Sequence, residues 1–217
     1  MPKLFIAGDS TAATKLHSKR PETGWGELLD EFITPNLEVR NFAQNGKSTK
    51  SFIDDGLLDH IEREIDESDY MLIQFGHNDE KIDDQSRYTH PQTTYQENLL
   101  KFVLIAKKNQ AIPILVTPIS RRRFIDKKTL DPLAVGEYPK AMKAFAIKHQ
   151  VELIDMFSIT QKLYEDLGDE LSKKLFLYLE PNEHENYPDG IQDDTHLSPY
   201  GAKLIASLIA VELKKII

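Results

Sequence analysis

The sequence predicts an α/β fold in which a parallel five-stranded sheet lies between two layers of helices. Five short, nearly continuously apolar segments alternate with segments of helical periodicity, and this alternation is typical of a parallel sheet covered on both faces. The chain has 217 residues without an internal repeat or low-complexity tract, which suits one fairly large domain. We therefore expect a single domain over residues 1–217, a three-layer α/β/α sandwich with a flavodoxin-like strand order.

Five apolar runs supply the strands of the predicted sheet, at residues 4–7, 37–43, 70–75, 112–118 and 151–156. Runs of this length, bounded by turn-forming residues, are typical of buried strands. The first run stops at Gly8-Asp9-Ser10, a sequence that favours a tight turn. Ser10 is therefore expected at the carboxyl end of a central strand, where open α/β sheets bind their ligands.

Helical spacing of apolar residues predicts six helices, at residues 24–34, 52–65, 91–106, 138–149, 158–175 and 198–216. Pro35 and Asn36 end the first of them. The last is expected to begin with Ser198 as its N-cap and Pro199 at its first helical position. Residues 80–90 and 119–137 are predicted to be loops, and residues 176–197 a long irregular segment.

The composition indicates a globular protein that binds neither nucleic acid nor membranes. The formal net charge is −8, whereas a general nucleic-acid or anionic-membrane surface needs a basic face. No apolar run approaches the ~18 residues of a membrane span. The absence of cysteine excludes disulfides, a thiol nucleophile and thiolate metal ligands. Because no charged and apolar leader precedes the first strand, a cytoplasmic location is expected.

Four short motifs follow the first three strands or precede the last helix: Gly8-Asp9-Ser10, Gln44-Asn45-Gly46, Gly76-His77-Asn78-Asp79 and Asp193-Asp194-Thr195-His196. The carboxyl ends of parallel strands meet at one edge of the sheet, so these motifs can be assembled around Ser10. In this order they resemble the blocks of the SGNH (GDSL-type) hydrolases. The resemblance implies an ester-hydrolysing site that contains Ser10, Gly46, Asn78 and His196.

Ester hydrolysis through a serine needs a base for the hydroxyl proton, a group that orients this base, and donors for the oxyanion. The resemblance implies that Ser10 is the nucleophile and His196 the general base. It also implies three oxyanion donors, namely the backbone N–H groups of Ser10 and Gly46 and the side-chain amide of Asn78. Glycine allows close backbone approach, and an amide donates without bringing a charge.

The orienting carboxylate has two neighbouring candidates. The family's Asp-x-x-His spacing favours Asp193 over Asp194, and a loop would let its carboxylate fold back onto His196. Taken singly, the motifs also have ordinary explanations. Asn45-Gly46 and Asn78-Asp79 suit turns or helix caps, and two aspartates before a helix suit its dipole. Their order and their common placement favour the catalytic interpretation.

A two-metal phosphoesterase is an alternative, because His77, Asp79, Asp9, Asp193 and His196 are residue types that ligate metals. The sequence resembles the calcineurin-like metallophosphatases only loosely. Those enzymes have the order Gly-Asn-His-Asp/Glu instead of Gly-His-Asn-Asp, and their opening Asp-x-His is missing at Asp9-Ser10-Thr11. We therefore expect neither a metal nor another cofactor.

Further segments along the whole chain resemble the rhamnogalacturonan acetylesterases, among them Arg20-Pro21-Glu22-Thr23-Gly24-Trp25-Gly26, residues 117–124, Leu179-Glu180-Pro181 and residues 186–190. This resemblance implies a carbohydrate O-acetylesterase that acts on the rhamnogalacturonan backbone of pectin, with an acetylated oligosaccharide as its substrate. Acetylated xylan or another acylated sugar is the first alternative. A carbohydrate-binding protein without activity is an alternative of another class.

Four side chains are candidates for binding this substrate. Trp25 would stack on a sugar ring, although a single tryptophan at a helix start more often serves packing. Arg121 and Arg122 would hold galacturonate carboxylates by bidentate hydrogen bonds, or else form ion pairs with the acidic excess of the chain. His77, from the motif Gly76-His77-Asn78-Asp79, is the fourth candidate.

Overall fold

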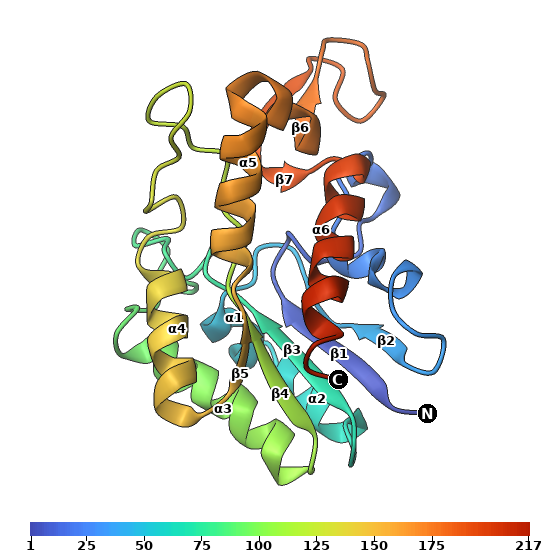
Figure 1. Ribbon diagram of the computed structural model, residues 1–217, viewed down its shortest axis with the longest axis vertical. Coiled ribbons are helices and arrows are strands. Elements are labelled where there is room, and N and C mark those ends of the chain that lie inside the picture. Colours follow the sequence, from blue (N-terminus) through green and yellow to red (C-terminus); the bar gives the residue numbers. More distant parts are fainter.

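A computed structural model describes all 217 residues of the chain. Five strands form one sheet in the order β2-β1-β3-β4-β5 (Figure 1), and all neighbouring pairs are parallel. This confirms the predicted flavodoxin-like order. The strands are β1 (Lys3–Gly8), β2 (Glu38–Asn41), β3 (Tyr70–Gln74), β4 (Ile112–Val116) and β5 (Glu152–Ile154).

Helices cover both faces of this sheet and give the predicted three layers (Figure 1). Side chains alternate between the faces along each strand, so Phe5 and Ala7 join one buried cluster while Leu4 and Ile6 join the other. None of the helices combines the length and apolar character needed to cross a membrane. The cluster that contains Phe5 and Ala7 is covered by α1 (Thr49–Asp54), α2 (Leu57–Glu64), α3 (Thr94–Lys108) and α4 (Tyr138–His149). The cluster that contains Leu4 and Ile6 is covered by α5 (Met156–Ser172) and α6 (Pro199–Leu213).

Three of the predicted helices differ in detail. Residues 24–34 form two short 3₁₀ turns instead of one helix, η2 (Trp25–Glu27) and η3 (Leu29–Glu31). The helix predicted at 52–65 is divided into α1 and α2 at Gly56, whose φ of 74° is left-handed and suits glycine. Gly168, with φ 72° and ψ 173°, kinks α5. Two further 3₁₀ turns are η1 (His17–Lys19) and η4 (Lys173–Leu175).

The segment predicted to be irregular, residues 176–197, is irregular only at residues 180–190, so the prediction is wrong for its two ends. It contains an antiparallel pair, β6 (Phe176–Leu179) and β7 (Ile191–Leu197), which lies beyond the carboxyl ends of the sheet strands (Figure 1). Polar residues dominate β7, and they hide the alternation by which a half-buried strand is recognised. The last helix starts as predicted, with Ser198 Oγ accepting a hydrogen bond from the Gly201 N–H and Pro199 at its first position.

Candidate active site

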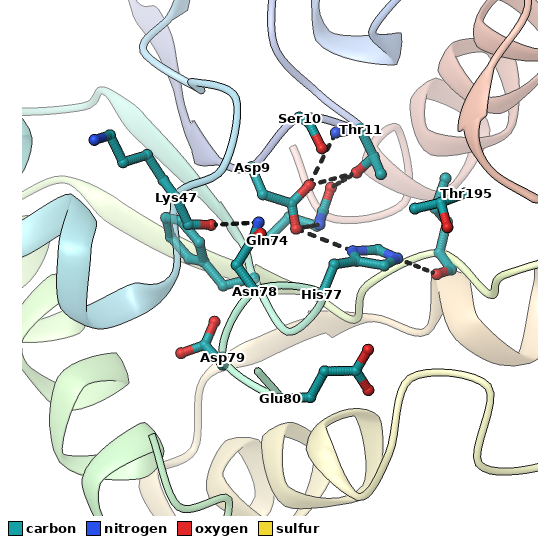
Figure 2. A network of polar contacts seen from close by, with 12 residues as sticks. Asp9, Ser10, Thr11, Lys47, Gln74, His77, Asn78, Asp79, Glu80 and Thr195 are labelled. Atoms are coloured by element: carbon teal, nitrogen blue, oxygen red, sulfur yellow. Dashed lines mark hydrogen bonds and ion pairs between the residues drawn. The ribbon is translucent and has the colours of Figure 1, made fainter. Parts of the chain in front are cut away.

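The motifs that follow β1, β2 and β3 meet at the carboxyl edge of the sheet. The Gln44 N–H donates to the Gly8 carbonyl over 3.1 Å, which ties the segment after β2 to the end of β1. Asn78 Nδ2 donates to the Lys47 carbonyl over 3.0 Å, which ties the turn after β3 to the same segment (Figure 2). The parallel sheet thus gathers residues that lie far apart in the sequence.

Ser10, His196 and Asp193 form a continuous chain of hydrogen bonds. Ser10 Oγ lies 3.0 Å from His196 Nε2, and His196 Nδ1 lies 2.7 Å from Asp193 Oδ2. Asp193 Oδ1 accepts the backbone N–H groups of Thr195 and His196 over 2.7 and 2.9 Å, which fixes the carboxylate. The side chains have the geometry of a Ser-His-Asp triad.

A bulge in β7 brings Asp193 and His196 together. Asp193 lies opposite Leu177 on β6, and Leu197 lies opposite Phe176, so residues 194–196 have no partner and bulge out of the pair. Such a bulge re-aims side chains. Asp193 therefore reaches His196 from a strand and not from the loop that the sequence predicts.

The charges of this pair support each other. Burial lowers the pKa of His196, but the hydrogen bond and negative charge of Asp193 outweigh burial, and the pKa is raised above its ordinary 6.5. Burial likewise raises the pKa of Asp193, yet the hydrogen bond and charge of His196 bring it below its ordinary value. The site therefore favours an imidazolium paired with a carboxylate, which is the state that forms when His196 takes a proton from Ser10.

Three N–H groups of the motifs have no hydrogen-bond acceptor within the chain. The backbone N–H groups of Ser10 and Gly46 donate to no acceptor within the chain. Gly46 has a φ of +77°, a left-handed conformation that favours glycine. The buried Asn78 amide donates one hydrogen to the Lys47 carbonyl, and its Oδ1 accepts a hydrogen bond from Arg87 Nη1 over 3.3 Å. Its second hydrogen and the two backbone groups form a candidate oxyanion hole.

Asp194 and Arg122 contact each other and not the triad. Arg122 Nε donates to Asp194 Oδ1 over 2.6 Å, and the Tyr178 hydroxyl donates to the same oxygen over 2.6 Å. Arg122 also pairs with Asp169 and is 6% exposed. Its predicted role in holding substrate carboxylates is therefore corrected to that of an ion pair, because burying a guanidinium requires partners of this kind.

Arg121 is likewise held by the protein. Its guanidinium pairs with Glu80 and donates to Thr195 Oγ1 over 3.1 Å. Further N–H groups donate to the carbonyls of Ala134 and His77 over 2.9 and 3.2 Å. The ion-pair alternative thus describes both arginines, and their contacts hold Thr195 and Asp194, the two residues between Asp193 and His196.

Trp25 and His77 are buried beneath the nucleophile turn. Trp25 is 0% exposed, and its Nε1–H donates to Gln74 Oε1 over 3.1 Å, so no face of the indole is open to a sugar. One ring nitrogen of His77 lies 3.0 Å from Asp9 Oδ2 (Figure 2), and the other lies 3.0 Å from the Ile119 carbonyl oxygen. The predicted substrate contacts of these two side chains are corrected to support of the turn that carries Ser10.

The residues of the metal alternative are divided between separate partners. Asp79 accepts hydrogen bonds from the Thr49 N–H and the hydroxyls of Thr49 and Thr89. Burial raises the pKa of Asp79 to about 7 despite these donors. Both nitrogens of His77 are engaged, and no group of three or more His, Asp or Glu side chains is placed to hold a metal ion.

Three charged residues at the site belong to none of the four motifs: Lys15, Glu22 and Arg87. Lys15 Nζ donates to the Ser10 carbonyl and, over 2.8 Å, to Asn45 Oδ1, and it lies 2.7 Å from Glu22 Oε1. Arg87 reaches Asn78 from the loop 80–90. Only Glu22 carried a sequence signal, because it stands in the segment Arg20–Gly26 that resembles the acetylesterases.

The chain belongs to the family of GDSL-like lipases/acylhydrolases, which it matches over residues 4–209. This confirms the membership that the four motifs indicated. It is 42% identical over 214 residues to the rhamnogalacturonan acetylesterase RhgT of Bacillus subtilis (strain 168), which covers 99% of this chain and 90% of that protein. It is 32% identical to the probable rhamnogalacturonan acetylesterase YesY of the same organism, over 98% of this chain and 93% of that one. The crystal structure of YxiM from Bacillus subtilis has the same fold, with a TM-score of 0.81 at 24% identity over 99% of this chain and 56% of that chain.

Proposed function

We propose that the protein is a serine esterase that removes O-acetyl groups from rhamnogalacturonan oligosaccharides. The observation that carries the chemistry is the hydrogen bond between Ser10 Oγ and His196 Nε2, with Asp193 on the opposite ring nitrogen. The substrate class is supported by similarity to RhgT over nearly the full length of the chain.

In the first half of the reaction, neutral His196 takes the Ser10 proton at Nε2 while Oγ attacks the acetyl carbonyl carbon. Asp193 accepts the Nδ1–H and stabilises the imidazolium. The carbonyl oxygen becomes an oxyanion, which the N–H groups of Ser10 and Gly46 and the free amide hydrogen of Asn78 stabilise. The sugar oxygen then leaves with the proton from His196, and Ser10 is left acetylated.

In the second half, a water molecule replaces the sugar. His196 takes a proton from this water as its oxygen attacks the acetyl carbon, and the same donors stabilise the second oxyanion. Collapse breaks the bond to Ser10 Oγ, which recovers its proton from His196. Acetate is released, and the enzyme returns to its starting state.

The test compares acetate release from acetylated rhamnogalacturonan oligosaccharides and acetylated xylan oligosaccharides, with Ser10→Ala as the control. The expected result is a preference for the pectic substrate that disappears in the variant. Activity on xylan alone would overturn the substrate and keep the mechanism. Release that does not depend on Ser10 would overturn the mechanism, and binding without any release would favour a carbohydrate-binding protein.

A further inference from the structure

Two buried charges lie beside the triad without a part in the mechanism above. Lys15 and Glu22 have side chains that are 0% and 8% exposed, and their Nζ and Oε1 atoms are 2.7 Å apart. Burying an ion pair carries a large desolvation cost, so a pair of this kind is weak support for stability by itself. Its contacts connect it to the catalytic groups instead.

Lys15 joins the nucleophile to the oxyanion segment. Its ammonium donates to the Ser10 carbonyl and to Asn45 Oδ1, the residue directly before Gly46. One cation therefore holds the backbone on the carbonyl side of Ser10 and the side chain of Asn45, the residue before Gly46. Both N–H groups of the candidate oxyanion hole depend on the positions of these two segments.

Glu22 is held in place by the hydrogen bonds and close packing of the residues that follow it. The Thr23 N–H donates to the Leu197 carbonyl over 3.1 Å, directly after His196, and the Trp25 N–H donates to the Thr11 carbonyl over 2.9 Å, directly after Ser10. A Cβ at Gly24 would lie 2.1 Å from the Ala13 carbonyl oxygen, so only glycine permits this approach. The segment around Glu22 thus bridges the serine turn and the histidine strand.

The Glu22 carboxylate faces His196 from the side opposite Asp193. Glu22 Oε1 lies 4.0 Å from His196 Nε2. The same oxygen is close to Lys15 but not aligned for a hydrogen bond with it, and it has no other hydrogen-bond partner. An opposite charge at this distance stabilises the imidazolium that forms during catalysis.

We propose that Lys15 and Glu22 are positioning residues of the esterase site, Lys15 by holding the Ser10 turn and the Gly46 segment in one geometry, Glu22 by stabilising protonated His196 at Nε2. This inference rests on the proposed esterase function. Neither side chain touches the reacting atoms, because Lys15 acts through backbone and Asn45 and Glu22 acts through the imidazole.

The charged groups around His196 define a sharp electrostatic test. Burial lowers the pKa of His196, Asp193 on β7 and then Glu22 raise it, and Lys15 lowers it by less than Glu22 raises it. Tyr187 is a further titratable group near the two carboxylates, because burial and the charges of Glu22 and Asp193 raise its pKa. Removing Glu22 alone exposes His196 to the uncompensated charge of Lys15, whereas removing both charges does not. The pKa of His196 should therefore fall in the order wild type, Lys15→Met/Glu22→Gln, Glu22→Gln.

The experiment is an NMR titration of the His196 ring in the full chain, assigned among the seven histidines with a His196→Gln variant. We expect Glu22→Gln to lower the pKa by about 1 unit, the lower end of the effect of an opposite charge at ~4–6 Å, and the double variant to lie between it and the wild type. Glu31→Gln, which removes one charge from an exposed ion pair with Lys203, is the matched control and should leave the pKa unchanged.

Turnover of p-nitrophenyl acetate supplies a second readout. Glu22→Gln should lower kcat about tenfold with little change in KM, because one pKa unit corresponds to one factor of ten. An unchanged His196 pKa in Glu22→Gln, or equal shifts in the single and double variants, would overturn the proposal. If Glu22→Gln does not fold, the wild type and the double variant still decide, since the double variant must titrate lower. The titration needs no turnover, so the expected order in an inactive protein would refute only the esterase function.

Discussion

Asp193 and Asp194 are adjacent in the chain and have separate partners, so a matched pair of substitutions distinguishes catalysis from support. Asp193→Asn keeps an oxygen for the backbone N–H groups of Thr195 and His196. Its amide NH₂ then faces His196 Nδ1, which stabilises the tautomer with hydrogen on Nε2. That tautomer cannot accept the Ser10 proton.

The two substitutions should lower kcat by very different factors. The loss of a correctly oriented base costs about 10⁴ in kcat, or ~5.5 kcal/mol, in a Ser-His-Asp triad. Asp194→Asn retains an oxygen for Arg122 and Tyr178 and loses only a charge whose side chain is 45% exposed. We expect about 1 kcal/mol of lost stability, about 2–4 °C in Tm for a chain of this size, and less than ~10-fold in kcat.

Acetate release and thermal unfolding, measured on both variants and the wild type, check this prediction. Asp193→Asn should have a Tm close to that of the wild type and a greatly reduced kcat. Asp194→Asn should have a lower Tm than the wild type and should keep most of its kcat. Comparable losses of kcat from the two substitutions would refute the assignment of Asp193 as the orienting carboxylate.

Three further outcomes follow from the site. The value of kcat/KM should rise with pH through an apparent pKa above 6.5, because His196 is a base only when neutral and its pKa is raised. A pH profile with a midpoint below 6.5 would contradict this prediction. Asn78→Ala should lower kcat by about 10²–10³ at little cost in KM, as expected for one oxyanion donor, and an unchanged kcat would remove Asn78 from the hole. Trp25→Phe should lose ~1–3 kcal/mol of stability with its hydrogen bond to Gln74 and part of its packing, while KM for oligosaccharides stays constant; a raised KM with unchanged Tm would restore the sugar-stacking role.

The sheet was predictable because its pattern is local and repeated. Each strand of the sheet comes from a short apolar run; helices follow β2, β3, β4 and β5, short 3₁₀ turns follow β1, and right-handed crossovers then leave few possible orders. The pair β6 and β7 was not predictable in the same way. The sequence Ile191–Leu197 carries the side chains of the site on a bulge, so polar residues stand where a sheet strand would show an apolar face.

The same distinction applies to the site. Ser10, Gly46, Asn78 and His196 stand in short contiguous motifs, and their order around a parallel sheet brings them to one edge. Lys15, Glu22 and Arg87 have no such motif, because their roles depend on how loops between the strands fold back over that edge. The contacts of Lys15 cross five residues to Ser10 and thirty to Asn45, separations that no periodicity records.

The three consecutive arginines show why adjacency of charge is a poor guide to an anion site. Successive side chains leave the backbone in different directions, so Arg121 pairs with Glu80, Arg122 with Asp194 and Asp169, and Arg123 with Asp131. The chain has a net charge of −8, so acidic partners are available within it. A buried guanidinium pairs with one of them, because a buried charge without a partner is costly. The cations next to the oxyanion donors are instead Lys15 and Arg87, and both reach that position from loops.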